Sequence, residues 1–451
     1  MTETVNTRPD HKAGLRNLLA EFATLRATQP VGRITEVFGN TLSVKGLSYK
    51  AGLGDQVCIH CSSGIVSGGE VLQLNREVLT IMPDQNLEGV AIGDEVILTG
   101  QNTIAPDNSW IGHVIDPFGR AIDGSFLMRG VNEYPLHGKP PLATERRGFG
   151  ERLETGTAVF NTLLPIVRGQ RIGLFAGSGV GKSTLLAKLA RNVQADIVVI
   201  ALIGERGREV REFVENVLGP EGMARAVVVA ATSDQSPLVR RQCALTAMSV
   251  AENFRDQGQH VLLLADSITR FAEAHREIAL ASGEPASLRG FPPSTSHMIM
   301  SLCERAGPSG ENGGDITGVF SVLVAGSDMD EPIADILRGV LDGHVVLDRQ
   351  IAERGRFPAV DLLRSVSRSL PGAASDAENT LITRARRLLG AYDRAEMMIQ
   401  SGLYLAGSDP VVDAAIRVWP GLDRFLSEDD TGRCADSFAR LEQVLAAEGG
   451  T

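Results

Sequence analysis

A glycine-rich stretch between an apolar strand-like segment and an apolar helical segment carries the strongest chemical signal in this chain. It reads Gly173-Leu-Phe-Ala-Gly-Ser-Gly-Val-Gly-Lys-Ser-Thr-Leu-Leu186, a Walker A phosphate loop with Ala176 where the usual pattern has Gly. Its glycines let successive backbone N–H groups point at phosphate oxygens, and the following helix presents its positive end to the same anion. We expect Lys182 to neutralise the β- and γ-phosphates and Ser183 to ligate Mg²⁺. The residues predicted to hold the nucleotide here are Gly177, Ser178, Gly179, Val180, Gly181, Lys182, Ser183 and Thr184.

Hydrolysis needs further groups on neighbouring strand ends, and two segments offer them. Val261-Leu-Leu-Leu-Ala is an apolar run that ends in Asp266, the Walker B arrangement, in which the carboxylate holds Mg²⁺ through its water shell. Another apolar run, Ile197 to Ile203, is followed closely by Glu205 and Arg206. Glu205 could accept a proton from the attacking water, and Arg206 could counter charge on the phosphoryl oxygens. Spacing alone leaves open that both are ordinary loop charges.

The elements that must position these groups alternate between strand and helix patterns. Continuously apolar strand candidates at 171–175, 197–203, 226–231, 261–265, 319–324 and 344–347 predict a parallel sheet covered on both faces. Short strands at 34–37, 41–44, 56–59, 70–74 and 95–98 predict a small barrel before it. Strand patterns vanish after about Pro371. The expected fold is an α/β P-loop parallel-sheet ATPase core with an N-terminal β-barrel and a C-terminal helical domain. We divide the chain into a helix (1–28), barrel (29–100), ATPase core (101–370) and helical tail (371–451).

Five apolar side chains fall on one face of a predicted helix near the start of the chain, before Pro30. They are Leu15, Leu18, Leu19, Phe22 and Leu25. The spacing is compatible with packing against the chain's own domain and with docking into another protein.

Composition narrows the function classes. The 451 residues carry a formal net charge of −11 and 43% hydrophobic residues, which suits a globular protein and gives no support to a broad electrostatic grip on nucleic acid. We find no signal peptide and no apolar run of the roughly 20 residues that span a bilayer, so we expect a cytoplasmic protein. The five scattered cysteines fit a reducing compartment. Cys58-Ile-His-Cys61 lacks a second ligand pair, so we do not assign zinc to it.

Several motifs together resemble the rotary ATP synthase catalytic-subunit superfamily and, within it, the flagellar protein export ATPases and the related type III secretion ATPases. These motifs are the phosphate loop, Gly204–Val210, Asp266–Ala272, Glu304–Gly307 and Pro358–Ser367. The resemblance implies that Glu205 is the catalytic base or the carboxylate that positions the attacking water, and that Arg206 and Arg270 lie near the γ-phosphate. It implies that Phe357 stacks on adenine and that Arg368 is an arginine finger inserted into the neighbouring subunit's site. ATP and Mg²⁺ would then bind between the subunits of a ring, which we expect to have six members.

The resemblance also implies partners and a location. The N-terminal helix would bind a FliH-like regulator, and the C-terminal helical domain would face a FliJ-like stalk and the export gate. Exported proteins and their chaperones would be further partners, and nucleic acid would not. The chain would be cytoplasmic and peripherally associated with the inner-membrane export apparatus. Thr295-Ser-His-Met-Ile-Met300 replaces the Leu-Pro-Arg segment common in this family, and this departure falls where the family's subunits meet one another.

The leading hypothesis is therefore an ATP hydrolase that energises flagellar type III protein export. The ATPase of a virulence type III secretion system is an alternative with the same catalytic residues. A Rho-like RNA translocase is disfavoured by the acidic balance and an aromatic fraction of 5%. A non-hydrolysing structural subunit is disfavoured by the presence of both Lys182 and Glu205.

Overall fold

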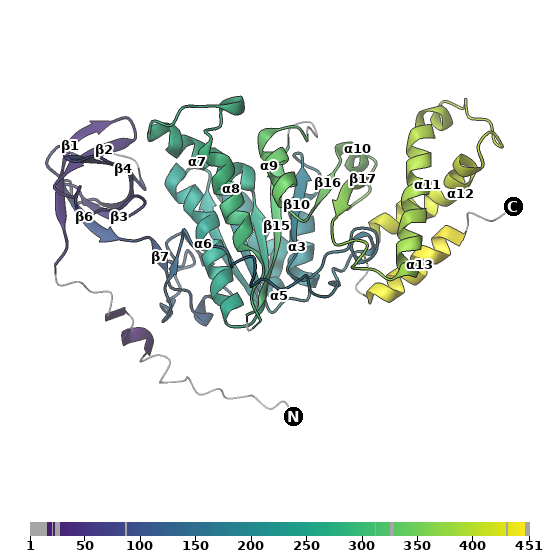
Figure 1. Cartoon of the computed structure of the whole chain (residues 1–451), viewed down its shortest axis with the longest axis horizontal. Coiled ribbons are helices and arrows are strands. Elements are labelled where there is room, and N and C mark those ends of the chain that lie inside the picture. The colour runs from purple at the N-terminus through teal and green to yellow at the C-terminus, as the bar shows by residue number, and fades with distance from the viewer. Residues whose placement is uncertain are drawn as a thin grey trace.

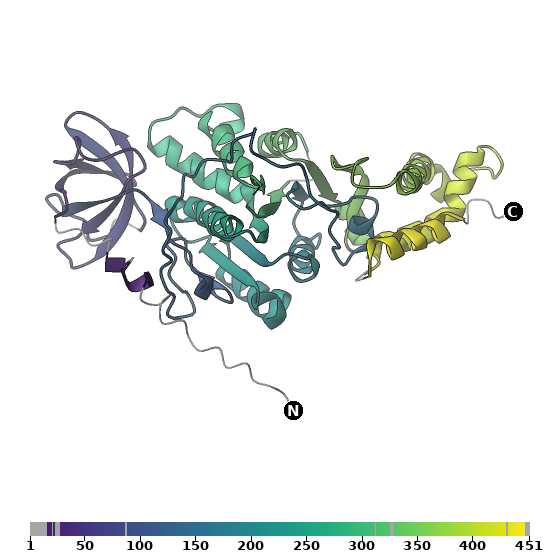
Figure 2. The same cartoon turned by 60° about the horizontal axis from the view of Figure 1, so that its bottom comes forward.

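The computed structural model describes residues 16–19, 21–22, 28–85, 88–311, 313–324, 329–429 and 432–446. These residues form a row of three parts, with a barrel at one end, a helix-covered sheet in the middle and a helical unit at the other end (Figure 1). The view turned by 60° shows the same order (Figure 2). The predicted architecture of barrel, P-loop core and helical tail is confirmed.

The barrel is a closed ring of six strands in the order β1-β2-β5-β4-β3-β6. Alternate side chains, among them Leu42, Val44 and Ile59, are fully buried inside it, which is the period of two that the sequence pattern predicts. The sequence interpretation missed β5, whose Leu79 and Ile81 complete the inner core. The strands are β1 (Val31–Phe38), β2 (Thr41–Lys45), β3 (Gln56–His60), β4 (Val66–Leu74), β5 (Val78–Pro83) and β6 (Glu95–Gly100).

The central sheet has the strand order β17-β16-β10-β15-β13-β11-β12-β8. All neighbours in this path are parallel except β16 and β17. Its main strands are β10 (Arg171–Ala176), β11 (Ile197–Glu205), β12 (Ala226–Thr232), β13 (His260–Asp266), β15 (Asp315–Leu323), β16 (Gly343–Leu347) and β17 (Val360–Ser367). Short strands are β7 (Thr103–Ile104), β8 (Val114–Ile115), β9 (Tyr134–Pro135) and β14 (Gly307–Pro308). The six predicted core strands are confirmed; β17 was not predicted.

Helices cover both faces of this sheet, as continuously apolar strands require. Side chains of β11 alternate between two cores, since Ile200 belongs to one and Val199 to the other. The first core contains α3 (Lys182–Asn192), α2 (Ala158–Asn161) and the C-terminal helices. The second contains α6 (Pro237–Asp256), α7 (Ile268–Ala281), α8 (Ser294–Arg305) and α9 (Pro332–Val340). Shorter pieces are α4 (Gly207–Glu212), α5 (Gly219–Met223), α10 (Arg349–Glu353), the π-helical segment Phe213–Leu218 and the 3₁₀ turns Asn108–Trp110 and Leu288–Gly290.

Three helices form the far end of the molecule: α11 (Asp376–Gln400), α12 (Pro410–Ser427) and α13 (Cys434–Ala446). A capping box between Ser375 and Glu378 starts α11, and the same Glu378 accepts from Arg152 at 2.9 Å. These contacts tie the helical unit to the segment that leads into β10.

Part of the predicted N-terminal helix is described. Arg16–Leu19 and Glu21–Phe22 are helical, with Leu18, Leu19 and Phe22 exposed. Asn17, on the other side, is buried and donates from Nδ2 to Asp107 Oδ2 at 3.3 Å. Leu15 and Leu25 of the predicted apolar face lie outside the described residues. Packing against the chain's own domain and docking into another protein are therefore compatible for this helix: one side contacts the chain itself, and the apolar side faces outward.

Among the helices in the described ranges, none has the length and hydropathy to cross a bilayer. All five cysteines are free thiols, and Cys58 Sγ lies 3.5 Å from His60 Nε2. A search of the described residues finds no group of three or more His, Cys, Asp or Glu side chains placed to hold a metal ion.

Candidate active site

The phosphate loop joins β10 to α3 at the carboxyl edge of the sheet. Gly179 and Gly181 have φ angles of 78° and 85°, left-handed values that favour glycine, and α3 begins directly after Gly181 at Lys182. The loop therefore ends where the unpaired N–H groups of an 11-residue helix converge. The predicted anion-binding geometry is present in the backbone itself.

Phe357 lies across the end of this loop. A Cβ added to Gly181 would be 3.1 Å from Phe357 Cδ1, so a larger residue there would push the ring back by a few tenths of an ångström. The Phe357 side chain is 49% exposed, and a cis peptide joins it to Pro358. The aromatic face thus borders the phosphate loop and remains accessible, as stacking on adenine requires.

Lys182 and Asp266 form an ion pair between the loop and the end of β13. Asp266 is only 4% exposed, and its Oδ1 also accepts from Ser321 Oγ at 2.6 Å. Sequence reasoning missed Ser321, although a hydroxyl in the apolar second half of β15, after Gly318, could have drawn attention to it. Ser321 donates to the same Oδ1 that pairs with Lys182, so the Walker B acid is held by β15 of the sheet as well as by the lysine.

Glu205 stands at the end of β11, the strand next to β13. Burial, the negative charge of Asp266 and a hydrogen bond with Glu209 together raise the pKa of Glu205 to about 7, against the opposing charge of Lys182. Lys182, Asp266 and Glu205 therefore act on one another electrostatically across one small region. A carboxylate with a pKa near neutrality is suited to accept a proton from water.

The two predicted arginines flank Glu205 differently. Arg206 precedes α4, and its side chain is 81% exposed with Nη1 3.6 Å from Glu209 Oε1. Arg270, in the first turn of α7, packs against the strand end, since a Cβ on Gly204 would be 3.4 Å from Arg270 Cβ. Arg270 Nη1 donates to Glu273 Oε2 at 2.9 Å. Both side chains border the carboxyl edge, and neither guanidinium is paired with Glu205 in the described contacts.

Arg368 is far from its own phosphate loop. In the sheet, Leu347 of β16 pairs with Ala176 of β10 and also with Val360, so β17 begins at the phosphate-loop edge. β17 is antiparallel and has eight residues, so it runs roughly 25 Å to the opposite edge, where Arg368 follows it. The structure thus brings together Lys182, Asp266 and Glu205 and separates Arg368 from them.

The residues at the carboxyl edge fit Mg²⁺. The Ser183 hydroxyl and the Asp266 carboxylate are hard oxygen donors, and Ser183 is exposed at the start of α3. Within the described part of the chain, both contacts of the Asp266 carboxylate use Oδ1. Oδ2 is therefore the oxygen that suits a metal-bound water.

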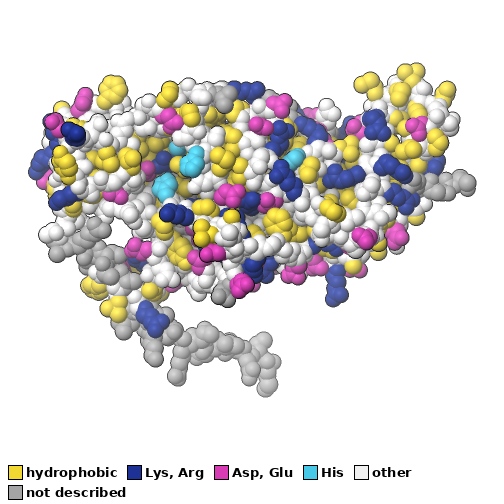
Figure 3. All heavy atoms as spheres, viewed as in Figure 1, with side chains coloured by type: hydrophobic (Ala, Val, Ile, Leu, Met, Phe, Trp, Pro, Cys, Tyr) yellow, Lys and Arg dark blue, Asp and Glu magenta, His cyan; other side chains and the backbone are white. Residues whose placement is uncertain are grey.

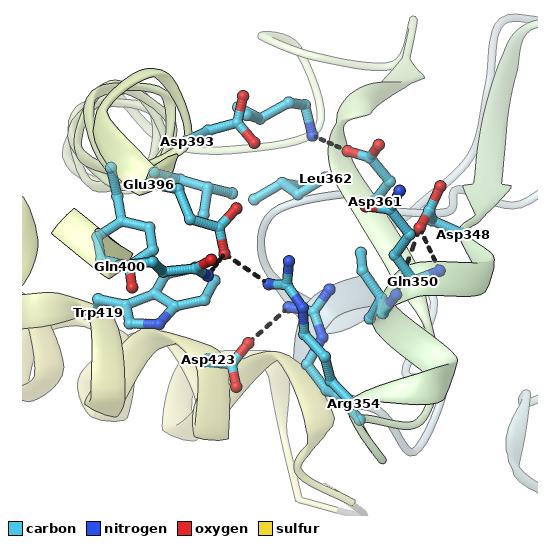
Figure 4. Close-up of a pocket in the computed structure, with 15 residues that line it drawn as sticks. Asp348, Gln350, Arg354, Asp361, Leu362, Asp393, Glu396, Gln400, Trp419 and Asp423 are labelled. Atoms are coloured by element: carbon cyan, nitrogen blue, oxygen red, sulfur yellow. Dashed lines mark hydrogen bonds and ion pairs between the residues drawn. The ribbon is translucent and has the colours of Figure 1, made fainter. Parts of the chain in front are cut away.

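A separate cavity of about 330 Å³ lies between the sheet edge and the C-terminal helices. Ion pairs between Arg354 and Glu396 at 2.8 Å and between Arg356 and Asp423 at 3.2 Å cross it, and Trp419 borders it beside them (Figure 4). These pairs anchor the segment directly before Phe357 to α11 and α12. The cavity does not include the phosphate loop, so we read it as the junction that positions Phe357 rather than as the nucleotide site.

Comparisons with known proteins agree with this geometry. Residues 156–367 match the ATP synthase alpha/beta family, nucleotide-binding domain, and residues 374–443 match the T3SS EscN ATPase C-terminal domain. Fold and site together define a P-loop ATPase subunit of the ATP synthase alpha/beta class.

Individual relatives specify the family further. The chain is 44% identical to the flagellum-specific ATP synthase of Caulobacter vibrioides, over 96% of this chain and 100% of the relative. It is 41% identical to the protein of that name from Salmonella typhimurium, over 96% and 97%. The solved structure of the assembled ATPase EscN, from the type III secretion system of enteropathogenic E. coli, superimposes with a TM-score of 0.83 at 35% identity, over 92% of this chain and 100% of EscN. The chain belongs to the family of flagellum-specific ATP synthases.

Proposed function

We propose that this protein hydrolyses MgATP and that the hydrolysis energises protein export by a flagellar type III secretion apparatus. The observation that carries the proposal is that Glu205, at the end of β11 beside the strand that carries Asp266, has its pKa raised to about 7, next to the Lys182–Asp266 ion pair. A simple nucleotide-binding subunit does not need such a base. The flagellar assignment is supported by relatives at 41–44% identity that are named flagellum-specific ATP synthases.

Each group has a distinct part in this reaction. The phosphate loop and Lys182 hold the phosphates, and Glu205 takes a proton from the water that attacks the γ-phosphorus in line. Lys182, Arg206 and Arg270 offset the negative charge on the phosphoryl oxygens. Ser183 and Asp266 would hold Mg²⁺, which supplies electrostatic stabilisation of the same charge when bound. Lys182 must leave Asp266 for the phosphates as the nucleotide enters.

The site is completed between subunits. Arg368 lies at the opposite edge of the sheet from the groups that it is predicted to assist, so in this proposal it serves the site of a neighbouring copy. EscN has been solved as an assembled ATPase, which supports a ring, with six subunits as the expected number. Specific activity should therefore rise with protein concentration.

The proposed partners follow from exposed surfaces and from relatives. Leu18, Leu19 and Phe22 are exposed on the N-terminal helix, where we place a FliH-like regulator. Leu403 and Leu405 are exposed in the turn between α11 and α12, on the unit proposed to face a FliJ-like stalk and the export gate. EscN has been solved with its central stalk EscO. We propose that the protein works in the cytoplasm at the membrane-bound export apparatus and handles exported proteins and their chaperones.

A virulence-type secretion ATPase is the second candidate, favoured by the match to EscN at 35% identity. It is weaker because the flagellum-specific relatives reach 44%. A strain that carries Glu205→Gln decides between the two: loss of flagellar filaments supports flagellar export, whereas retained swimming with lost effector secretion supports the alternative. RNA translocation has less support, since acidic and basic side chains are interspersed on the face shown in Figure 3.

The Glu205→Gln variant also tests the chemistry. ATP should bind as before, because the amide keeps the shape of the side chain, while turnover should fall by about 10²–10⁴-fold with the loss of the base. Equilibrium binding of a fluorescent ATP analogue and steady-state phosphate release measure the two quantities. Glu221→Gln, a change to an exposed acid in α5, is the matched control. Unchanged turnover in Glu205→Gln would refute the assigned role.

We also propose that the divisions 1–28, 29–100, 101–370 and 371–451 are functional units. The barrel strands span 31–100, and the C-terminal helices begin at Asp376. Limited proteolysis that cuts first near residues 28, 100 and 370 would support these limits.

A further inference from the structure

The amino edge of the central sheet holds a charged group to which the mechanism above assigns no role. Arg171, the first residue of β10, donates from Nε to Asp342 Oδ2 at 2.9 Å and from Nη2 to Asp342 Oδ1 at 3.0 Å. The Arg171 backbone N–H donates to the same Oδ2 at 3.0 Å, and Nη1 donates to Glu304 Oε1 at 2.6 Å. The Arg171 and Asp342 side chains are 13% and 17% exposed. A bidentate, mostly buried pair of this kind has one preferred geometry.

Asp342 also contacts Arg368 through the backbone. The Arg368 backbone N–H donates to the Asp342 carbonyl at 3.0 Å, and Arg368 Nη2 donates to the Arg338 carbonyl at 3.0 Å. The Arg338 carbonyl lies in the last turn of α9 and the Asp342 carbonyl lies just before β16, in the turn that links them. The backbone and the guanidinium of Arg368 therefore rest on one turn, and Arg171 clamps that turn to β10.

β10 ends at the phosphate loop. Its six residues run from Arg171 to Ala176 and span roughly 17 Å. The strand lies between β15 and β16 inside the sheet, so its two ends cannot move independently over a large range. One strand thus connects a subunit's own phosphate loop with the arginine that the same subunit would lend to its neighbour.

We propose that Arg171 and Asp342 are positioning residues for Arg368. They hold the α9–β16 turn in the position from which the Arg368 guanidinium reaches the next subunit's site. The inference rests on the proposed role of Arg368 as an arginine finger. It deepens that role by identifying what fixes the finger in place. A displacement of about 1 Å in a group that stabilises the transition state costs up to roughly 10²-fold in rate.

A purely structural role for the same pair makes a different prediction, which depends on the subunit that carries the change. A structural defect lowers activity whichever subunit is altered. A positioning defect matters only in the subunit that donates the finger.

The test uses mixtures of two inactive variants. Glu205→Gln chains lack the base but can donate Arg368, and Arg368→Ala chains lack the finger but keep the base, so their mixture should regain activity at one kind of interface. Arg171→Lys is then added to either chain, with Arg33→Lys, which alters an exposed ion pair on the barrel, as the control. Turnover, the KM for ATP and the melting temperature are measured for each mixture and variant.

We expect Arg171→Lys in the Glu205→Gln chain to lower the restored turnover by roughly tenfold with little change in KM, because the finger acts in the transition state. The same change in the Arg368→Ala chain should alter the restored turnover less than about twofold. Equal losses in both placements, or no loss in either, would overturn the proposal. An inactive mixture before Arg171 is altered would instead refute the shared site itself, and the clamp with it.

Asp342→Asn provides a second variant. It keeps the size of the side chain and removes the charge that holds Arg171, so it should reproduce the same dependence on placement. If Arg171→Lys fails to fold, as shown by its melting curve, Asp342→Asn alone decides the question in the same mixtures, provided that its melting temperature is close to that of the parent chain.

Discussion

The two edges of the central sheet differ in how their residues are assembled. At the carboxyl edge, a continuous loop from Gly177 to Ser183 meets two strand ends that carry Glu205 and Asp266. At the amino edge, Arg171, Asp342 and Arg368 come from three separate strands or turns and are joined by an ion pair and a backbone hydrogen bond. In the proposed function, the first edge binds nucleotide by itself, whereas the second acts on the site of a neighbouring copy. Each chain would then carry two halves of different sites.

Arg368→Ala should have the largest effect and separates the two edges most clearly. We expect turnover to fall by about 10³–10⁵-fold, the usual contribution of an arginine finger, while ATP binding to the isolated chain is retained. Steady-state phosphate release and equilibrium nucleotide binding check this. Arg349→Ala, which alters an exposed pair with Glu353, should leave both nearly unchanged. Turnover within tenfold of the parent would remove the finger assignment.

Phe357→Ala probes binding at the carboxyl edge. Stacking on a base contributes about 1–3 kcal/mol, so the Kd for ATP should rise by roughly five- to 150-fold. Phe357→Tyr keeps the aromatic face and should bind ATP nearly as well as the parent. Calorimetric titration with ATP measures both variants. A Kd for Phe357→Ala within twofold of the parent would place adenine elsewhere.

The pH dependence of kcat/KM should report Glu205 in the free enzyme. Because the pKa of Glu205 is raised to about 7, lowering the pH below 7 protonates the base, and kcat/KM should fall about tenfold per pH unit and level off above 8. Glu209→Gln removes a neighbour that raises this pKa, so the profile should shift to lower pH. A profile that stays flat from pH 5.5 to 8 would contradict the assignment of Glu205 as base.

Ser321→Ala should have the smallest effect. It removes one hydrogen bond to the Asp266 carboxylate, a loss of about 1 kcal/mol and so roughly fivefold in activity. The loss should appear as a higher Mg²⁺ concentration for half-maximal turnover, since Asp266 is then less well oriented. Ser427→Ala, near the end of α12, is the matched control. An unchanged Mg²⁺ requirement would show that Lys182 and the backbone suffice to hold Asp266.

Much of the fold was predictable because local patterns determine it. The buried strands β10, β11, β12 and β13 are continuous apolar runs, and the barrel strands alternate. β17 escaped prediction because it is an edge strand whose polar Asp361, Arg364 and Ser365 interrupt any simple period. β5 escaped because it ends in Pro83 and begins only four residues after the end of β4.

The residues of the candidate site divide into those that local patterns predict and those that only the fold brings together. Lys182, Ser183 and Asp266 are recognisable because a glycine-rich loop and a strand-terminal acid have local signatures. Ser321 and the Arg171–Asp342 pair become meaningful only through strand neighbours far apart in sequence. The separation of Arg368 from its own phosphate loop depends on the antiparallel direction of β17, which no local pattern indicates.

The central claim is that each active site takes its base from one chain and its arginine finger from the next. Mixing Glu205→Gln with Arg368→Ala chains in equal amounts tests it directly. Random assembly pairs an intact base with an intact finger at about a quarter of the interfaces, so we predict turnover far above that of either variant alone. A mixture no more active than its two components, under conditions where rings form, would contradict the account.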